Sequence, residues 1–390
     1  MQPVPNSIAA MQPELTEWRR DLHRHPELGY QETRTMRVLA EKLRSWGLDS
    51  VETGIGKTGV VGVLHGRNGP GEAILLRSDM DALPILEETG LDHASVNQGN
   101  MHACGHDGHM TMLLGAARHL SETRNFDGTV YFCFQPAEEG GAGAKAMIED
   151  GLFDRYPARA VYGMHNWPGF PIGSFAVRPG PVMASADEFR IVVRGAGGHA
   201  ALPHLAKDPV LAGAQLVTAL QSIVARKVDP MKPAVLSVST FHAGTASNII
   251  PDEAHLTGTV RTFDEDVETL IIDEIKRLCA EIGQAMGVTI TYERRENAYP
   301  ATVNDPAETA FAAGVLDGLV GPEHVDRERA PAMGGEDFAF MAREKPGCFV
   351  FIGNGDSAPL HTATYDFDDE AAPLGVAYWT RLVEQALPTR

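Results

Sequence analysis

The sequence contains few cysteines, few positive charges for its length and no long apolar run. Its four cysteines are scattered over 390 residues without a CxxC pair, which argues against a disulfide scaffold in a chain of this size. No segment approaches the roughly 20 consecutive apolar residues that a membrane-spanning helix needs. The first residues include Pro3, Pro5 and Pro13 and no apolar segment typical of a signal peptide. We therefore expect a soluble protein of the cytoplasm.

The chain is strongly acidic. Lysine and arginine total 33 and aspartate and glutamate total 52, so the formal net charge is −19. Such a chain is a poor electrostatic match for nucleic acid or for an anionic membrane surface, and no basic stripe stands out along it. We expect neither of these partners, and instead a small-molecule substrate. If that substrate is an anion, a local arginine has to hold it against the field of the whole chain.

Length and hydrophobic pattern predict a two-domain α/β protein. A chain of 390 residues exceeds what one ordinary core supports. In the first third, apolar runs of strand length (59–64, 73–76 and 129–134) alternate with segments of helical spacing (33–46 and 108–120). Continuous apolar strands that alternate with helices are typical of a mainly parallel sheet covered on both faces.

The middle of the chain has a different pattern. A strand, a helix that begins at Asp208-Pro209, two strands, a helix from Asp266 and a final strand follow one another. This order, βαββαβ, is the ferredoxin-like plan. We predict an inserted domain of this type at 183–298, flanked by the two parts of a catalytic domain at 1–182 and 299–390.

Chemically reactive side chains gather in five segments, each beside glycine or proline or at the end of an apolar run. Ligands usually bind at the strand ends of an open α/β sheet. The segments are Arg77 to Asp81, His102 to His109, Gln135 to Gly141, Gly163 to Pro168 and Leu360 to Thr362. Together they offer a thiolate, imidazoles and carboxylates, which are ligand types that zinc-like metals take.

Two of these segments carry most of the argument. Cys104 and His106 flank a glycine, which lets both side chains turn toward one ion. The adjacent carboxylates of Glu138 and Glu139 repel each other unless a cation lies between them or their roles differ. One of them can ligate a metal while the other takes a proton from the metal-bound water.

The residues alone leave alternatives open. Cys104 beside a histidine also fits a metal-independent Cys–His amidase with a cysteine nucleophile, although a nucleophile would not need the paired glutamates. Asp79 and Asp81, directly after a buried strand, either serve a site or cap a turn. A binding protein with a decayed site is disfavoured because Glu138 and Glu139 are both intact.

The order of motifs resembles that of the aminoacylase and carboxypeptidase G family of two-metal amidohydrolases, in particular its hippurate hydrolase and auxin-conjugate hydrolase branch. The resemblance extends from His23-Arg24-His25-Pro26-Glu27-Leu28 to Tyr365-Asp366-Phe367. The resemblance implies a catalytic domain of zinc exopeptidase type with two divalent metal ions. It also implies that the inserted domain forms a homodimer and covers the site. The implied reaction is cleavage of N-acyl-L-amino acids, hippurate-like or N-acetyl conjugates among them, to a carboxylic acid and a free amino acid. A metallo-dipeptidase of the same family is the alternative.

The resemblance assigns roles at the metal centre. Cys104 matches a bridging ligand, which is an aspartate in the wider family, and Glu138 matches the general base. The remaining matched ligands are His106, Glu139, His165 and His361. Asp79 matches the supporting acid of a His-x-Asp motif whose histidine is Arg77 here, so that ligand is absent. Thiolate and imidazole suit zinc, cobalt or nickel, and manganese occurs in relatives.

The inserted domain contributes three further matches. His199, in Gly197-Gly198-His199-Ala200, matches a histidine that polarises the scissile carbonyl, and in relatives it reaches into the site of the partner subunit. Asn248 and Arg261 match contacts to the substrate carboxylate, and Arg261 would be the local cation that the net charge of −19 requires. Glu336, just after Gly334-Gly335, is expected to support the metal ligands.

Overall fold

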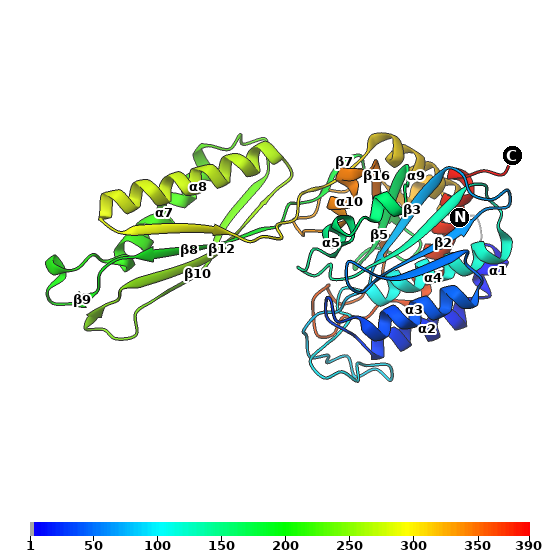
Figure 1. Cartoon of the computed structure of the whole chain (residues 1–390), viewed down its shortest axis with the longest axis horizontal. Helices are drawn as coiled ribbons and strands as arrows, with labels where there is room; N and C mark the ends of the chain where they lie inside the picture. Colours follow the sequence, from blue (N-terminus) through cyan, green and yellow to red (C-terminus); the bar gives the residue numbers. More distant parts are fainter. Residues whose placement is uncertain (1–3) are drawn as a thin grey trace. The chain divides into compact units, whose positions relative to one another are not determined.

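The computed structural model describes residues 4–390, which divide into two compact units (Figure 1). Unit 1 comprises residues 4–182, 303–330 and 337–390, and unit 2 comprises residues 183–302 and 331–336. Residues 331–336 belong to unit 2 because the Ala184 N–H donates to the carbonyls of Ala332 and Gly334 at 3.0 Å each. No pattern in the sequence indicated this return of the chain.

Unit 1 is built around an eight-stranded sheet with the order β1-β2-β4-β3-β5-β16-β6-β15. The strands are β1 (Ser50–Ile55), β2 (Gly59–His65), β3 (Ala73–Asp79), β4 (Thr129–Gln135), β5 (Ala160–Trp167), β6 (Phe175–Ala176), β15 (Val325–Asp326) and β16 (Gly347–Gly353). The central strands β4, β3, β5 and β16 run parallel, whereas β1 and β2 are antiparallel to their neighbours. The predicted mixed α/β class with a mainly parallel central sheet is confirmed.

Helices cover both faces of this sheet. They are α1 (Asn6–Ala9), α2 (Gln12–Arg24), α3 (Thr33–Ser45), α4 (His106–Thr123), α5 (Gly143–Glu149), α6 (Leu152–Arg155), α9 (Pro306–Val320), α10 (Phe338–Glu344) and α11 (Ala372–Ala386). Figure 1 shows α2, α3 and α4 together on one side and α5 and α10 on the other. The α4 and α11 helices pack very closely, since a Cβ at Gly115 would lie 2.4 Å from Val376 Cγ2.

The parallel strands set the place of the site. Every residue of β3, β4 and β16 is buried, which explains why these runs are apolar on both faces. In the parallel register Asp79 pairs with Gln135, and Trp167 pairs with Gly353. The carboxyl ends of the four central strands therefore share one edge of the sheet.

Unit 2 contains an antiparallel sheet with the order β10-β12-β8-β13. Its strands are β8 (Asp187–Arg194), β10 (Ala234–Ala243), β12 (Glu253–Thr262) and β13 (Thr289–Arg294), and its helices are α7 (Pro209–Arg226) and α8 (Glu265–Met286). In chain order these elements are βαββαβ, as predicted. Asp208 caps α7 by accepting from the Val210 N–H at 2.8 Å, and Asp264 caps α8 in the same way.

Smaller elements complete the fold. They are the ribbon of β9 (Gly198–His199) with β11 (Ile249–Ile250), the ribbon of β7 (Gly180–Met183) with β14 (Thr302–Asn304), and the 3-10 turns Pro203–Leu205, Pro322–His324 and Asp369–Ala371. Among residues 4–390, none of the helices combines the length and the apolar character that crossing a membrane requires.

Candidate metal centre

The five ligands predicted from sequence meet at the carboxyl edge of the parallel strands in unit 1. They are Cys104 in the turn before α4, His106 as the first residue of α4, Glu139 in the loop after β4, His165 in strand β5 and His361 in the loop after β16. The side chain of His361 is 52% exposed and that of Glu139 is 13% exposed, while the other three residues are buried. The ligand group is therefore buried at Cys104, His106 and His165 and reaches the surface at His361.

Cys104 Sγ lies at the centre of this group. It is 3.4 Å from His165 Nε2 and 3.3 Å from His361 Nε2. Glu139 Oε1 lies 3.2 Å from His361 Nε2 and 3.9 Å from His106 Nε2. The ligand atoms of Cys104, His106 and His165 lie within 4.8 Å of one another and form one set. Those of Cys104, Glu139 and His361 form a second set by the same measure. Two sets that share one thiolate are consistent with two divalent ions.

Two buried atoms of this group lack a hydrogen-bond partner within residues 4–390. They are His106 Nε2 and Glu139 Oε1, the latter in ion-pair contact with His361. A buried polar atom without a hydrogen bond costs about 1–3 kcal/mol, and native proteins rarely leave one. Imidazole nitrogen and carboxylate oxygen are ordinary ligands of divalent transition metals. The donor set therefore fits metal ions.

The two buried histidine ligands are each oriented by a backbone carbonyl that contacts the ring nitrogen Nδ1. His106 Nδ1 lies 2.8 Å from the carbonyl oxygen of Asp81, and His165 Nδ1 lies 2.6 Å from that of Asn166. A carbonyl accepts only, so each Nδ1 carries the proton and each Nε2 keeps its lone pair. Such partners fix the tautomer and the ring plane of a metal ligand.

Asp79, the predicted supporting acid, is fully buried behind the ligands. Its carboxylate lies 2.6 Å from His109 Nδ1 and accepts from Arg77 Nη1 at 2.8 Å. Burial raises the pKa of Asp79, but the neighbouring His106, His109 and Arg77 outweigh burial and hold this pKa well below its usual range. These contacts favour a role at the site over a turn cap.

His109 is a residue of this centre that we did not single out from sequence. Its Nδ1 faces Asp79, while its Nε2 accepts from the backbone and the side-chain N–H of Asn166, both at 2.9 Å. Asn166 Nδ2 also donates to the Cys104 carbonyl at 2.7 Å, and Tyr365 donates to Asn166 Oδ1 at 2.7 Å. His109 therefore supports the Cys104 turn through Asn166. Its position one helical turn after His106 in α4 was the available signal.

The turn at Cys104 depends on glycine. Gly105 has φ +86°, and a Cβ there would lie 2.2 Å from Asn166 Nδ2. Only glycine adopts this backbone conformation so close to another side chain without strain. The turn aims Cys104 and His106 into the same space, as the intervening glycine predicted.

The environment of Cys104 does not suit a cysteine nucleophile. Burial raises the pKa of the Cys104 thiol well above its usual range, and the carboxylates of Glu139, Glu138 and Asp79 raise it further. Catalytic cysteines lie in electropositive surroundings that lower the pKa of the thiol. A metal ion instead binds the thiolate directly and displaces its proton. The acidic surroundings thus favour the metal interpretation over a Cys–His amidase.

The predicted contacts from the inserted domain all lie in unit 2. His199 is exposed in β9 and pairs with Ile249 of β11, and the Ala200 N–H donates to the Asn248 carbonyl at 3.0 Å. This ribbon brings His199 and Asn248 together. Glu336 lies in the 331–336 segment of unit 2. The roles of these residues at the metal centre stay predictions.

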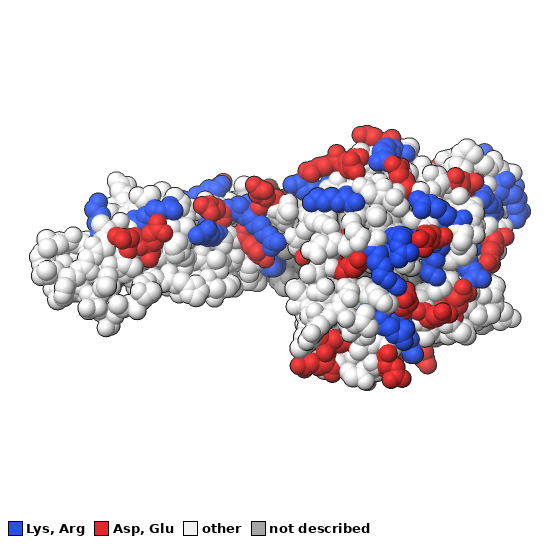
Figure 2. Space-filling model, turned by 60° about the horizontal axis from the view of Figure 1, so that its bottom comes forward, with Lys and Arg blue, Asp and Glu red and all other residues white. Residues whose placement is uncertain are grey.

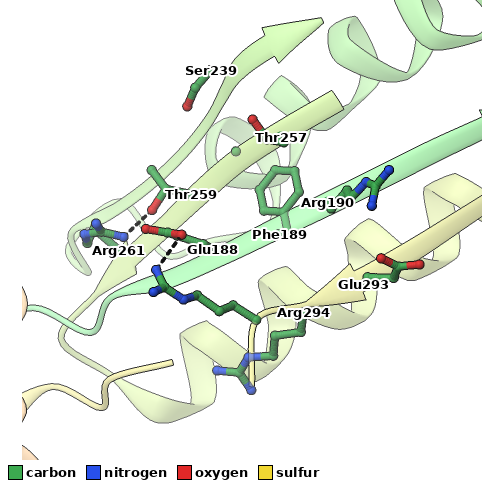
Figure 3. A pocket seen from close by; sticks show the side chains of 11 residues that line it. Glu188, Phe189, Arg190, Ser239, Thr257, Thr259, Arg261, Glu293 and Arg294 are labelled. Atoms are coloured by element: carbon green, nitrogen blue, oxygen red, sulfur yellow. Dashed lines mark hydrogen bonds and ion pairs between the residues drawn. The ribbon is translucent and has the colours of Figure 1, made fainter. Parts of the chain in front are cut away.

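Arg261 lies near the end of β12, on the open face of the unit 2 sheet (Figure 3). It lines a cavity of about 560 Å³ together with Glu188, Thr257 and Thr259. Its Nη1 donates to the carbonyl of Val260 at 3.0 Å and to the hydroxyl of Thr259. Arg261 is half-buried, and its role as a contact to the substrate carboxylate stays a prediction.

Comparison with known proteins places the chain in a family. The model of peptidase family M20/M25/M40 matches residues 75–385. Hippurate hydrolase of Campylobacter jejuni is 42% identical over 96% of this chain and 97% of its own, and N-acetylcysteine deacetylase of Bacillus subtilis is 38% identical over 96% and 97%. The crystal structure of YXEP from Bacillus subtilis, a dinuclear metal-binding peptidase of the M20 family, superimposes with a TM-score of 0.83 at 35% identity and covers 98% of this chain and 100% of that one.

The fold and the ligand set thus define a dinuclear metallohydrolase. The chain belongs to peptidase family M20/M25/M40. The resemblance found in the sequence motifs is confirmed, and the ligand groups of unit 1 are consistent with the two metal ions of such a centre.

Proposed function

We propose that this protein hydrolyses N-acyl-L-amino acids to a carboxylic acid and a free amino acid, with two divalent ions held by Cys104 and the four ligands around it. The observation that carries the proposal is the overlap of two ligand sets at one thiolate, with a Glu138 oxygen within 4.8 Å of ligand atoms of His106 and Glu139. The hippurate hydrolase and deacetylase relatives support an acylated amino acid as substrate. A cytoplasmic location is part of the proposal, in keeping with four free, buried cysteines.

The chain's own residues divide the chemistry between them. Divalent ions bound here would lower the pKa of a bound water and polarise the amide carbonyl. Glu138 accepts the proton of the attacking water and passes it to the leaving nitrogen. His199 donates a hydrogen bond to the developing oxyanion. Arg261 and Asn248 hold the carboxylate of the amino acid, which keeps the scissile bond in register with Glu138.

The geometry of unit 2 supports a homodimer in which each site takes residues from both chains. The β9–β11 ribbon adjoins the start of β12 because Gly195 donates to the Asp252 carbonyl at 2.8 Å, whereas Arg261 lies near the end of β12. Eight residues of extended strand separate Glu253 from Arg261, which is about 26 Å. One small substrate does not span that distance. Arg261 and the His199 ribbon of one chain therefore serve different sites.

The surface around this ribbon also supports pairing with a second copy. Exposed large apolar side chains of the neighbouring segments are Leu202, Leu205, Leu211, Phe241 and Ile249. In Figure 2 the end of unit 2 that carries β9 has no charged atoms on the face shown, while Lys and Arg are interspersed with Asp and Glu elsewhere on that face. Exposed large apolar side chains on an uncharged end of a domain are typical of an interaction site. We place the dimer contact there.

A mixed dimer tests this sharing of sites. Each homodimer, His199→Ala or Glu138→Gln, should lose at least about 10²-fold in kcat. A heterodimer with one chain of each variant, purified through two different tags, should regain about half the wild-type activity, because one of its two sites keeps both groups. His324→Ala, a partly exposed histidine in the Pro322–His324 turn of unit 1, is the control and should keep full activity. A heterodimer as inactive as both homodimers would place His199 in its own chain's site.

A substrate matrix tests the reaction itself. The metal-loaded enzyme should hydrolyse benzoyl, acetyl, indoleacetyl or longer N-acyl conjugates of L-amino acids and leave their D-enantiomers intact, because Arg261 and Asn248 fix the carboxylate on one side. Matched dipeptides with a free α-amine are included for each amino acid, and zinc, manganese, cobalt and nickel are added in separate arms. Amide cleavage is followed by release of the free amino acid. Hydrolysis of dipeptides alone would show a metallo-dipeptidase instead.

A further inference from the structure

Arg329 is a half-buried cation that is held by aromatic rings instead of by a carboxylate. Its guanidinium carbon Cζ lies 4.6 Å from the ring centre of Trp167, 4.3 Å from that of Phe170 and 5.2 Å from that of Phe351. Its Nε is buried without a hydrogen-bond partner, and no carboxylate among residues 4–390 forms an ion pair with it. Three aromatic rings therefore hold the planar group in place without neutralising its charge.

The missing acid partner is unusual in a chain with a formal net charge of −19. Arg19, Arg77 and Arg327 each form an ion pair with an aspartate. Burial lowers the pKa of Arg329, and the charge of Asp326 offsets this effect only in part. A partly desolvated cation is stabilised when an anion pairs with it. This position therefore gains from an anionic ligand.

A second arginine adds to the positive charge at this place. Arg178 Nη1 donates to the Arg329 carbonyl at 3.0 Å, and within residues 4–390 its Nε is also buried without a hydrogen-bond partner. Both residues belong to unit 1, where Arg178 follows β6 and Arg329 follows the parallel neighbour β15. Two arginines that lack paired acids make the local potential positive in an otherwise acidic chain.

The aromatic rings connect this cation to the metal centre. Trp167 and the ligand His165 are two positions apart in β5, so their side chains lie on the same face of the sheet. Their ring centres are 6.3 Å apart, and the ring centre of Trp167 is 5.1 Å from that of Phe351. One indole ring thus separates Arg329 from a metal ligand. Trp167 and Arg329 are both partly exposed, so a small ligand has access to them.

We propose that Arg329 determines specificity by binding a second carboxylate of the substrate. The inference rests on the proposed function, in which Arg261 and Asn248 hold the α-carboxylate, so the anion at Arg329 is a further one. Its source is either the acyl group, as in an N-succinyl conjugate, or the amino-acid side chain, as in an N-acyl glutamate. The N–H donors of a planar guanidinium match the two oxygens of a carboxylate. The aromatic rings fix the plane of the guanidinium and so reduce the entropy lost on binding.

Two variants separate this role from a general effect of charge. Arg329→Met removes the cation but keeps a long side chain that packs well against aromatic rings. Arg327→Met is the matched control, because Arg327 is exposed, lies two positions away and pairs with Asp317 at 2.6 Å. It removes the same charge from the chain and none from the aromatic rings. Thermal unfolding measures what each substitution costs the fold, and Arg329→Gln replaces Arg329→Met if the latter does not fold.

The substrates form two pairs that differ in charge and hardly in shape. N-succinyl-L-alanine and N-succinamoyl-L-alanine place a carboxylate or a carboxamide on the acyl group. N-acetyl-L-glutamate and N-acetyl-L-glutamine place it on the amino-acid side chain. For each compound, kcat/KM is measured with the metal-loaded, full-length wild type and both variants, at low and at high ionic strength.

We expect the wild type to prefer carboxylate over carboxamide by about 10- to 100-fold in kcat/KM in at least one pair, and that pair identifies the source of the second carboxylate. Arg329→Met should lose this preference but keep the wild-type rate on the carboxamide, whereas Arg327→Met should retain the preference. Added salt should weaken the preference of the wild type. The absence of a preference in both pairs, or an equal loss on acids and amides in Arg329→Met, would overturn the proposal.

A fifth compound, N-acetyl-L-alanine, separates this proposal from the proposed function. If the wild type cleaves it but shows no preference in either pair, only the role of Arg329 fails. If the wild type cleaves none of the five compounds, the proposed function fails, and binding decides on Arg329. Binding is followed by the fluorescence of Trp167, which is identified by comparison with Trp167→Phe. The acid of one pair should then bind about 10- to 100-fold more tightly than its amide to the wild type but not to Arg329→Met, and equal binding would refute the inference.

Discussion

Glu138→Gln is expected to lower kcat by about 10²- to 10⁴-fold while two metal ions stay bound. The glutamine side chain has the size of glutamate but accepts no proton, so it removes the base without opening a cavity. Glu138 is 7% exposed, and the replacement leaves the hydrogen bond from its backbone N–H to Asp81 Oδ1 intact. The measurement is kcat on the preferred substrate together with the metal content of the same sample.

The adjacent glutamate supplies the control. Glu139 Oε1 faces both His361 and His106, so Glu139→Gln removes a ligand and should lower metal content as well as activity. The same chemical change at neighbouring positions thus separates a base from a ligand. An active Glu138→Gln enzyme would refute the role of Glu138, and loss of metal from both variants would make both residues ligands.

Local signals made much of the fold predictable. The apolar run of β4 ends at Phe134, a few residues before the two glutamates, and such a run in a strand of this length indicates burial on both faces. The pair Asp208-Pro209 marks the start of α7 because both the cap and its N–H partners lie within four residues. The ligand segments were visible because each gathers reactive side chains at the end of an apolar run or beside glycine or proline.

The support of the metal centre was not predictable in the same way. Asp81 and its partner Glu138 are 57 positions apart, and they meet only because β3 pairs with β4 in the register that places Asp79 opposite Gln135. A sequence does not fix that register, since many parallel pairings bury equally apolar strands. The link of His109 to Asn166 depends on packing over a similar separation.

The inserted domain shows a further limit of motif matching. The motifs gave Asn248 and Arg261 one shared role at the substrate carboxylate. The strand geometry of unit 2 instead places Arg261 near the end of β12 and the ribbon beside Asn248 near its start. In the proposed homodimer the two residues at one substrate carboxylate come from different chains, which no spacing along a single sequence reveals.

Removal of metal is the second large effect that we expect. Chelation should abolish amide hydrolysis, because no side chain at the centre replaces the ions as a source of activated water at neutral pH. Without metal, burial and the surrounding carboxylates keep the Cys104 thiol protonated, since they raise its pKa well above the usual range. A protonated thiol is a poor nucleophile, so no alternative cysteine chemistry should appear.

The most direct test of a dinuclear amidohydrolase centre is a metal titration of the chelated enzyme, with bound ions and hydrolysis of an N-acyl amino acid measured on the same samples. We predict that activity returns as the second ion per chain binds, and that bound metal protects Cys104 from alkylation. Activity that persists in chelator and disappears when Cys104 is alkylated would contradict the metal centre and indicate a Cys–His amidase instead.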